Sequence, residues 1–97
     1  MTDRDLLRQT ELLVGRVAHW TPARWNDRGE AVHALGQRLA DACAGVEGQP
    51  ARPLPRLADT ALPDQLRVLV ADLVAADAPE EVLDRMAADV RAVRHAL

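Results

Sequence analysis

The chain contains no Lys, Ile, Ser, Phe or Tyr, and it has one Cys among 97 residues. Without Ser no serine nucleophile is available, and Cys43 alone cannot form an internal disulfide. All 12 basic residues are therefore Arg. Because Arg, Ala, Pro and Gly use GC-rich codons and the missing Lys, Ile, Phe and Tyr use AT-rich ones, the composition indicates a high-GC bacterial genome rather than a functional choice of Arg.

Basic blocks and long apolar runs are also lacking. The formal net charge is −3 and the Arg residues are spread among the acids, which argues against nucleic acid as the main partner. No apolar stretch approaches the ~20 residues of a membrane span, and residues 1–5 are polar, unlike a signal peptide. Together with the single Cys, these features predict a cytoplasmic protein that does not enter a membrane.

Four segments of the chain carry apolar residues at alternating spacings of four and three. The segments cover about residues 3–20, 28–46, 62–76 and 78–95. At ~100° per residue this spacing gathers the apolar side chains on one helix face, and a near-heptad repeat favours shallow helix crossing. A chain of this length can form one hydrophobic core. The sequence therefore predicts an all-α, single-domain four-helix bundle over residues 1–97.

The helix boundaries are marked by capping signals. N-caps are predicted for Thr2, Thr21, Asp27 and Asp77. Pro22 follows Thr21 at the first position of a short turn, and Glu30 and Glu80 stand at capping-box positions after Asp27 and Asp77. The short spacing between the last two helices predicts an antiparallel hairpin.

Residues 47–61 form the one extended connection. Pro50, Pro53 and Pro55 stiffen it toward polyproline II, and Leu54 and Leu57 are spaced to pin it onto the bundle. A connection of this length lets the second and third long helices be something other than antiparallel neighbours. Gly36, beside the apolar seam of the 28–46 helix, indicates close approach of a neighbouring helix or of a Trp ring.

Two apolar residues are candidates for contact with a partner. Leu12 points to the polar side of the first helix, whereas Leu7 widens its buried stripe. The 62–76 helix is apolar over a wide arc that includes Val68, so it is either central or part of an interface.

The corner between the first two long helices holds both aromatic residues, Trp20 and Trp25, with Arg24 between them. Trp20 continues the predicted buried seam of the first helix, and both rings are expected to seal the end of the bundle. Trp25 and Arg24 are then the residues left free to contact another molecule, since Trp and Arg are enriched at binding sites.

No constellation of residues predicts catalysis or a cofactor. Glu30 and His33 form a Glu-x-x-His pair, but di-iron bundles use two such pairs with further carboxylates, and this pair lies off the apolar seam. Cys43 lies on the seam without basic neighbours, which favours a structural role. The Cys and His residues lack zinc-site spacing, so no metal or cofactor is predicted.

The sequence thus favours a small, non-catalytic interaction protein that acts through helical faces, by binding a protein partner or by forming a homodimer. The alternative is a ligand-binding or enzymatic bundle with its pocket near Trp20, Arg24, Trp25 and His33. A third hypothesis, a nucleic-acid regulator, requires salt-dependent DNA binding and is opposed by the acidic balance.

Overall fold

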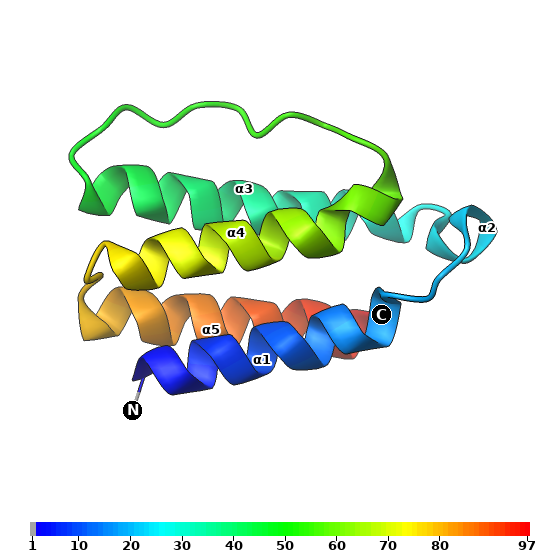
Figure 1. The fold of residues 1–97 in the computed structure, drawn as a ribbon, viewed down its shortest axis with the longest axis horizontal. Helices are drawn as coiled ribbons and strands as arrows, with labels where there is room; N and C mark the ends of the chain where they lie inside the picture. The colour runs from blue at the N-terminus through cyan, green and yellow to red at the C-terminus, as the bar shows by residue number, and fades with distance from the viewer. Residues whose placement is uncertain (1) are drawn as a thin grey trace.

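Four long helices form the bundle, as a computed structural model of residues 2–97 shows (Figure 1). The elements are α1 (Thr2–Val17), the one-turn α2 (Pro22–Trp25), α3 (Arg28–Val46), the 3₁₀ turn η1 (Asp59–Ala61), α4 (Leu62–Ala75) and α5 (Glu80–Ala96). No strand occurs within the described residues. The predicted all-α four-helix bundle is confirmed.

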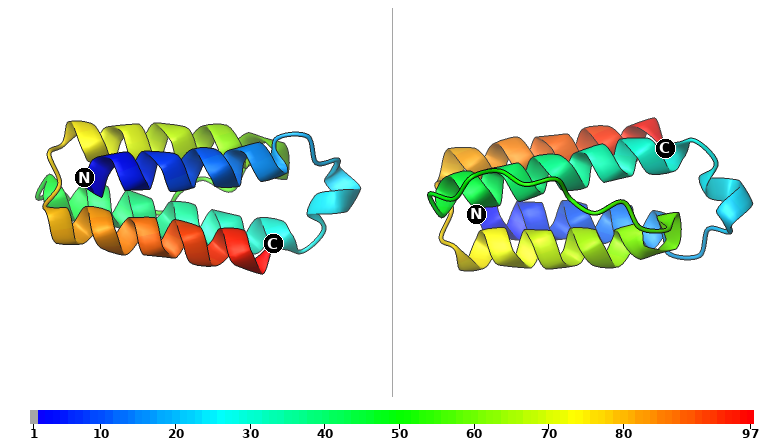
Figure 2. Two further views of the ribbon diagram at one scale, coloured as in Figure 1. Left: turned by 90° about the horizontal axis from the view of Figure 1, so that it is seen from below. Right: turned by 90° about the horizontal axis from the view of Figure 1, so that it is seen from above.

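The helices occupy the four corners of the bundle, with α1 diagonal to α3 and α4 diagonal to α5 (Figure 2). α1 packs mainly against α5, and α3 packs mainly against α4. Each of these pairs is parallel, because the linker of residues 47–61 carries the chain back along the bundle between α3 and α4. α4 and α5 run antiparallel as predicted, but they face each other across the core.

The core consists of the apolar seams that the sequence periodicity identified. Buried side chains come from all four long helices; they include Leu6, Leu13, Leu35, Leu39, Leu66, Leu73, Met86 and Val90. Two polar residues of α1 are also buried, Gln9 and Thr10. Thr10 Oγ1 donates to the Leu6 carbonyl of the same helix at 2.7 Å, and Gln9 Oε1 accepts from Arg94 Nη2 of α5 at 3.0 Å, so both buried polar groups have partners.

The first helix ends three residues earlier than predicted. α1 stops at Val17, and the next residues form a turn closed by a bond from Trp20 N to the Val17 carbonyl at 3.0 Å. Thr21 then has extended backbone and caps α2, accepting from Arg24 N at 3.2 Å, with Pro22 at the first helical position. The Thr21–Pro22 prediction is confirmed. The capping role predicted for Thr2 depends on a side chain outside the described part of the chain.

Two predicted capping boxes are wrong. Asp27 occupies the N-cap position of α3, but its side chain makes no cap hydrogen bond in the described structure, and its backbone is already helical. Asp77 lies beyond the end of α4 in the left-handed region, with φ of 54°, and Pro79 is the residue that precedes α5. The chain needs a reversal after α4, and Asp tolerates this conformation better than most residues.

Candidate interaction surfaces

The two Trp rings at the α1–α2 corner meet edge to face. Their centroids are 5.3 Å apart and their planes are at 74°, a favourable aromatic geometry. The guanidinium carbons of Arg24 and Arg28 lie 5.2 Å and 5.9 Å from the centroid of Trp20. Trp20 therefore contacts one aromatic ring and two cations.

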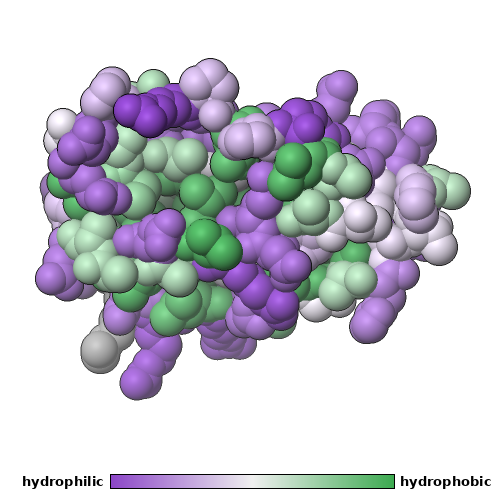
Figure 3. Space-filling model, turned by 45° about the horizontal axis from the view of Figure 1, so that its top comes forward, coloured by the Kyte–Doolittle hydropathy of each residue, from purple (hydrophilic) through white to green (hydrophobic). Residues whose placement is uncertain are grey.

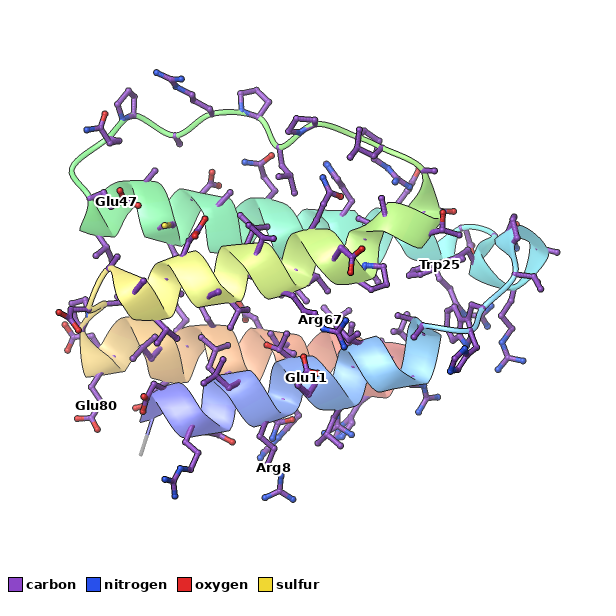
Figure 4. All side chains as sticks on the ribbon, viewed as in Figure 1. Arg8, Glu11, Trp25, Glu47, Arg67 and Glu80 are labelled. Carbon is purple, nitrogen blue, oxygen red and sulfur yellow. The ribbon has the colours of Figure 1, made fainter. Side chains whose placement is uncertain are left out.

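The burial of these rings reverses the sequence prediction. Trp25 is 0% exposed and belongs to the core, whereas Trp20 is only partly buried against it. Figure 4 shows Trp25 turned from α2 toward the bundle. Because α1 ends at Val17, the helical angle that placed Trp20 on the buried seam does not apply, and the one-turn α2 directs Trp25 inward instead. The prediction that Trp25 remains free is wrong, while Arg24 is exposed.

The predicted pocket at this corner is not among the described hollows, whose lining residues all fall within 38–89. Trp25 Nε1 is buried without a hydrogen-bond partner among the described residues. His33, proposed for the same pocket, is half-buried and has its Nε2 3.1 Å from the Leu54 carbonyl. Since a carbonyl only accepts, Nε2 is the donor, and His33 holds the linker rather than facing the Trp pair.

The linker is fixed to α3 by one side chain in particular. Gln37 Oε1 accepts from Leu54 N at 2.7 Å, and Gln37 Nε2 donates to the Arg52 carbonyl at 2.9 Å. Gln65 Nε2 donates to the Pro55 carbonyl at 3.2 Å, which ties the linker to α4 as well. The Gln37 amide satisfies backbone groups of an extended segment as a neighbouring strand would.

Leu54 and Gly36 form the apolar part of the same attachment. A Cβ placed on Gly36 would lie 2.9 Å from Leu54 Cδ2. Gly36 therefore lies at a close approach, but the nearest group is the linker rather than the predicted helix or Trp ring. Leu66 and Leu69 of the neighbouring helix α4 lie farther away, at ordinary contact distances of 3.8 Å and 3.7 Å from the same Cβ position. Leu57, predicted to pin the linker too, is 52% exposed, so that part of the prediction is wrong.

An apolar hollow of about 310 Å³ separates the linker from α4. It is lined by Leu54, Leu57, Ala61, Asp64, Gln65, Val68 and Leu69. Val68 is 59% exposed, more than any other large apolar residue in the described structure. In Figure 3, hydrophobic side chains gather in hollows on this face, which α3, α4 and the linker form. We call the part formed by α4 and the linker residues 54–61 the α4 face.

An ion pair borders the α4 face on its other side. Arg67 of α4 makes a two-pronged contact with Glu11 of α1, both N···O distances being 3.1 Å, and Figure 4 shows the two side chains pointing toward one another. The Arg67 Nη1 atom is also 3.9 Å from Asp64 Oδ1. The bond to Glu11 raises the pKa of Arg67, but the group is exposed to solvent, which screens such a pair.

Two other apolar residues of α1 are exposed. Leu12 is 44% exposed, in agreement with its predicted position on the polar side. Leu7 is 43% exposed, so its assignment to the buried stripe is wrong. Leu7 lies one turn before Glu11, on the side of α1 that meets α4, and it therefore extends the apolar surface around the α4 face.

The largest described hollow, about 830 Å³, lies between α3 and α5 beside the α4–α5 joint. Its apolar lining includes Val46, Val82 and Met86, and the Arg38–Asp89 ion pair of 3.4 Å joins the two helices there. This hollow was not predicted from the sequence. Its residues are far apart along the chain and carry no common motif. They meet because α3 packs beside α5, which the sequence pattern does not reveal.

Cys43 is buried, and its thiol donates to Glu47 Oε1 at 3.0 Å. Burial, followed by the hydrogen bond to Glu47 and its negative charge, raises the pKa of the thiol from 9.0 to about 11. A thiol held protonated is a poor nucleophile, which supports the structural role predicted for Cys43. Within the described residues no group of His, Cys, Asp and Glu could hold a metal ion.

Comparisons with known proteins add no family. No protein-family model, no curated protein and no solved structure matches the chain. Among the described helices, none is both long and apolar enough to cross a membrane.

Proposed function

We propose that this is a small interaction protein that binds another protein through the α4 face. The observation that carries the proposal is the exposure of Val68 (59%) and Leu57 (52%) on the border of one apolar hollow. Scattered single apolar residues are normal on a protein surface, but neighbouring ones around a hollow favour a binding surface.

The shape of the α4 face suits a protein partner. Its hollow of about 310 Å³ is at the lower limit of small-molecule pockets, and its lining contains one charged residue, Asp64. An apolar side chain from a partner would fill it and would remove Leu57 and Val68 from water. Each large side chain buried in this way contributes roughly 1.5–3 kcal/mol.

The chemistry of the chain supports binding rather than catalysis. The raised pKa of Cys43 opposes nucleophilic attack, and His33 is engaged by the linker. The competing hypothesis of a ligand pocket at Trp20 and Trp25 has less support, because Trp25 is buried. A cytoplasmic location remains part of the proposal, since a single thiol fits a reducing compartment.

Site-specific photocrosslinking tests the proposal. A photoreactive amino acid is placed at position 68, at position 57 and, as a matched control, at Leu12, which is exposed to a similar degree outside the α4 face. In extracts of the native cell we expect positions 68 and 57 to crosslink to one and the same protein and position 12 to give no such product. Equal labelling at all three positions would contradict a specific α4 face.

A further inference from the structure

The outer surface of α4 has a self-complementary arrangement of charge and shape. Its exposed positions include Asp64, Arg67, Val68, Ala71 and Ala75. The charges of Asp64 and Arg67 are of opposite sign and three residues apart. Asp64 points outward near the middle of this surface, with Arg67 on the α1 side and Val68 on the linker side.

Resting on the proposed function, we propose that the partner is a second copy of this chain, with the two α4 helices packed antiparallel about a two-fold axis. In such a pair the same surface of each copy is used, and equivalent flanks of the two helices meet. Arg67 of each copy then lies beside Asp64 of the other. The symmetry makes two such ion pairs.

The antiparallel direction follows from the charges. In a parallel two-fold pair, each residue is level with its own equivalent, so Asp64 would be level with Asp64 and Arg67 with Arg67. Like charges in contact across an interface oppose association. Only the antiparallel pair brings each of these charges level with one of opposite sign.

The same register matches the apolar shapes. With Arg67 beside the Asp64 of the other copy, the next residue, Val68, comes level with the residue before Asp64. That level, on the linker flank, holds the hollow lined by Ala61, Gln65 and Leu57. Val68 of each copy therefore enters the hollow of the other, and Leu57 is covered at the same time.

The size of the contact sets the expected affinity. In this register the two α4 helices lie beside each other only over residues 62–69, which span about 12 Å at ~1.5 Å per residue. With Leu57 and Leu7 at its borders, a single-helix contact falls near or below the ~800 Å² per partner of a standard stable interface. We therefore expect a dimer that dissociates on dilution through the micromolar range.

Sedimentation equilibrium over about 1 to 500 μM tests the assignment. The wild-type chain is expected to shift from monomer to dimer across this range. Val68→Asp is expected to remain monomeric, because it puts a carboxylate into an apolar hollow, whereas Leu12→Asp, outside the α4 face, is expected to dimerise as the wild type does. Circular dichroism verifies that the variants fold, which is expected because both positions are exposed.

Charge reversal tests the register. In a Glu11→Gln background, which removes the ion pair to α1 and is expected to leave association unchanged, Arg67→Asp and Asp64→Arg are each expected to weaken the dimer by about tenfold or more. The double reversal is expected to recover the affinity to within about threefold, because it restores both ion pairs. Equal weakening by the single and double reversals would overturn the antiparallel register.

The outcomes for the dimer and for the proposed function differ. A wild-type chain that stays monomeric at 500 μM, or a dimer unaffected by Val68→Asp, would show that a second copy is not the partner of the α4 face. If the chain is monomeric while positions 68 and 57 crosslink to another protein, the proposed function stands without the dimer. If those positions crosslink to nothing and the chain is monomeric, both proposals fail.

Discussion

Leu54 Cδ2 lies where a side chain on Gly36 would begin, at 2.9 Å from an ideal Cβ. This contact joins the middle of the extended linker to the middle of α3. It accounts for a Gly in a helix interior, where Gly costs roughly 1 kcal/mol relative to Ala. The position of the linker along the bundle depends on this contact and on the Gln37 amide beside it.

Substitution of Gly36 tests how firmly the linker is seated. For Gly36→Ala we expect a change in unfolding free energy within about 1 kcal/mol, because the gain in helix propensity offsets a small shift of the Leu54 methyl group. For Gly36→Val we expect a loss of about 1–3 kcal/mol, because the added methyl groups displace Leu54 and meet Leu69.

Gly45 supplies the control in the same helix. No atom outside its local backbone lies within 4 Å of an ideal Cβ there, among the residues described. We expect Gly45→Val to be neutral or slightly stabilising in urea denaturation. Equal losses of unfolding free energy from Gly36→Val and Gly45→Val would show that Leu54 does not pack against Gly36.

The Gln37 amide predicts a local effect that hydrogen exchange can measure. Gln37→Met keeps the length of the side chain but removes the acceptor for Leu54 N–H and the donor for the Arg52 carbonyl. We expect a loss of about 1 kcal/mol and faster amide exchange at Leu54, with little change in the core of α1. Gln49→Met, an exposed change on the same linker, serves as the control. Unchanged exchange at Leu54 would argue against the Gln37 contact.

The four-helix architecture was predictable because the apolar seams of long helices have a strong period. Leu6, Leu13, Leu35 and Leu39 are fully buried as their spacing indicated. The linker was recognisable from its prolines, and Gly36 signalled a close contact. The identity of the contacting group was not predictable, because it depends on how residues 47–61 return along the bundle.

The Trp corner was mispredicted for a physical reason. Periodicity orients a helix of several turns, but it cannot orient the single turn of α2. The position predicted for Trp20 assumed that the first helix continues through residue 20, whereas α1 ends at Val17. The large hollow between α3 and α5 was not predictable either, because the sequence does not state which helices are neighbours.

The opposite burial of the two rings predicts distinct fluorescence. Trp20→Phe leaves only Trp25, and we expect blue-shifted emission that acrylamide quenches poorly, because that ring is fully buried. Trp25→Phe leaves only Trp20, and we expect red-shifted emission that is readily quenched.

The loss of unfolding free energy on removing each Trp ring is expected to increase with the burial of that ring. Trp25→Ala should cost about 3–5 kcal/mol, as for other large core residues, and Trp20→Ala distinctly less. Indistinguishable quenching or equal losses would contradict the assignment of Trp25 to the core.

The raised pKa of Cys43 makes the free energy of unfolding depend on pH in the alkaline range. Few other groups of this chain titrate there, so the effect can be measured directly. The chain has no Lys and no Tyr, so Cys43 is the only side chain with a pKa between about 9 and 11. The folded pKa of about 11 lies above the unfolded value near 9.0, so the folded state holds the thiol proton more tightly. Stability from this group is therefore fully present below pH 9 and falls as the pH rises toward 11.

Urea denaturation at a series of pH values, for the wild type and for Cys43→Ala, measures this linkage. We expect the unfolding free energy of the wild type to decline between pH 9 and 11, and that of Cys43→Ala to be lower throughout but flat over the same interval. Glu47→Gln removes both the negative charge and the carboxylate acceptor that raise the thiol pKa. The decline should still begin near pH 9, where the unfolded thiol ionises, but it should end at a lower pH and with a smaller total loss of stability, and the variant should be modified faster by a thiol reagent at pH 9. A slope in Cys43→Ala equal to that of the wild type would assign the pH dependence to some other group and contradict the raised pKa.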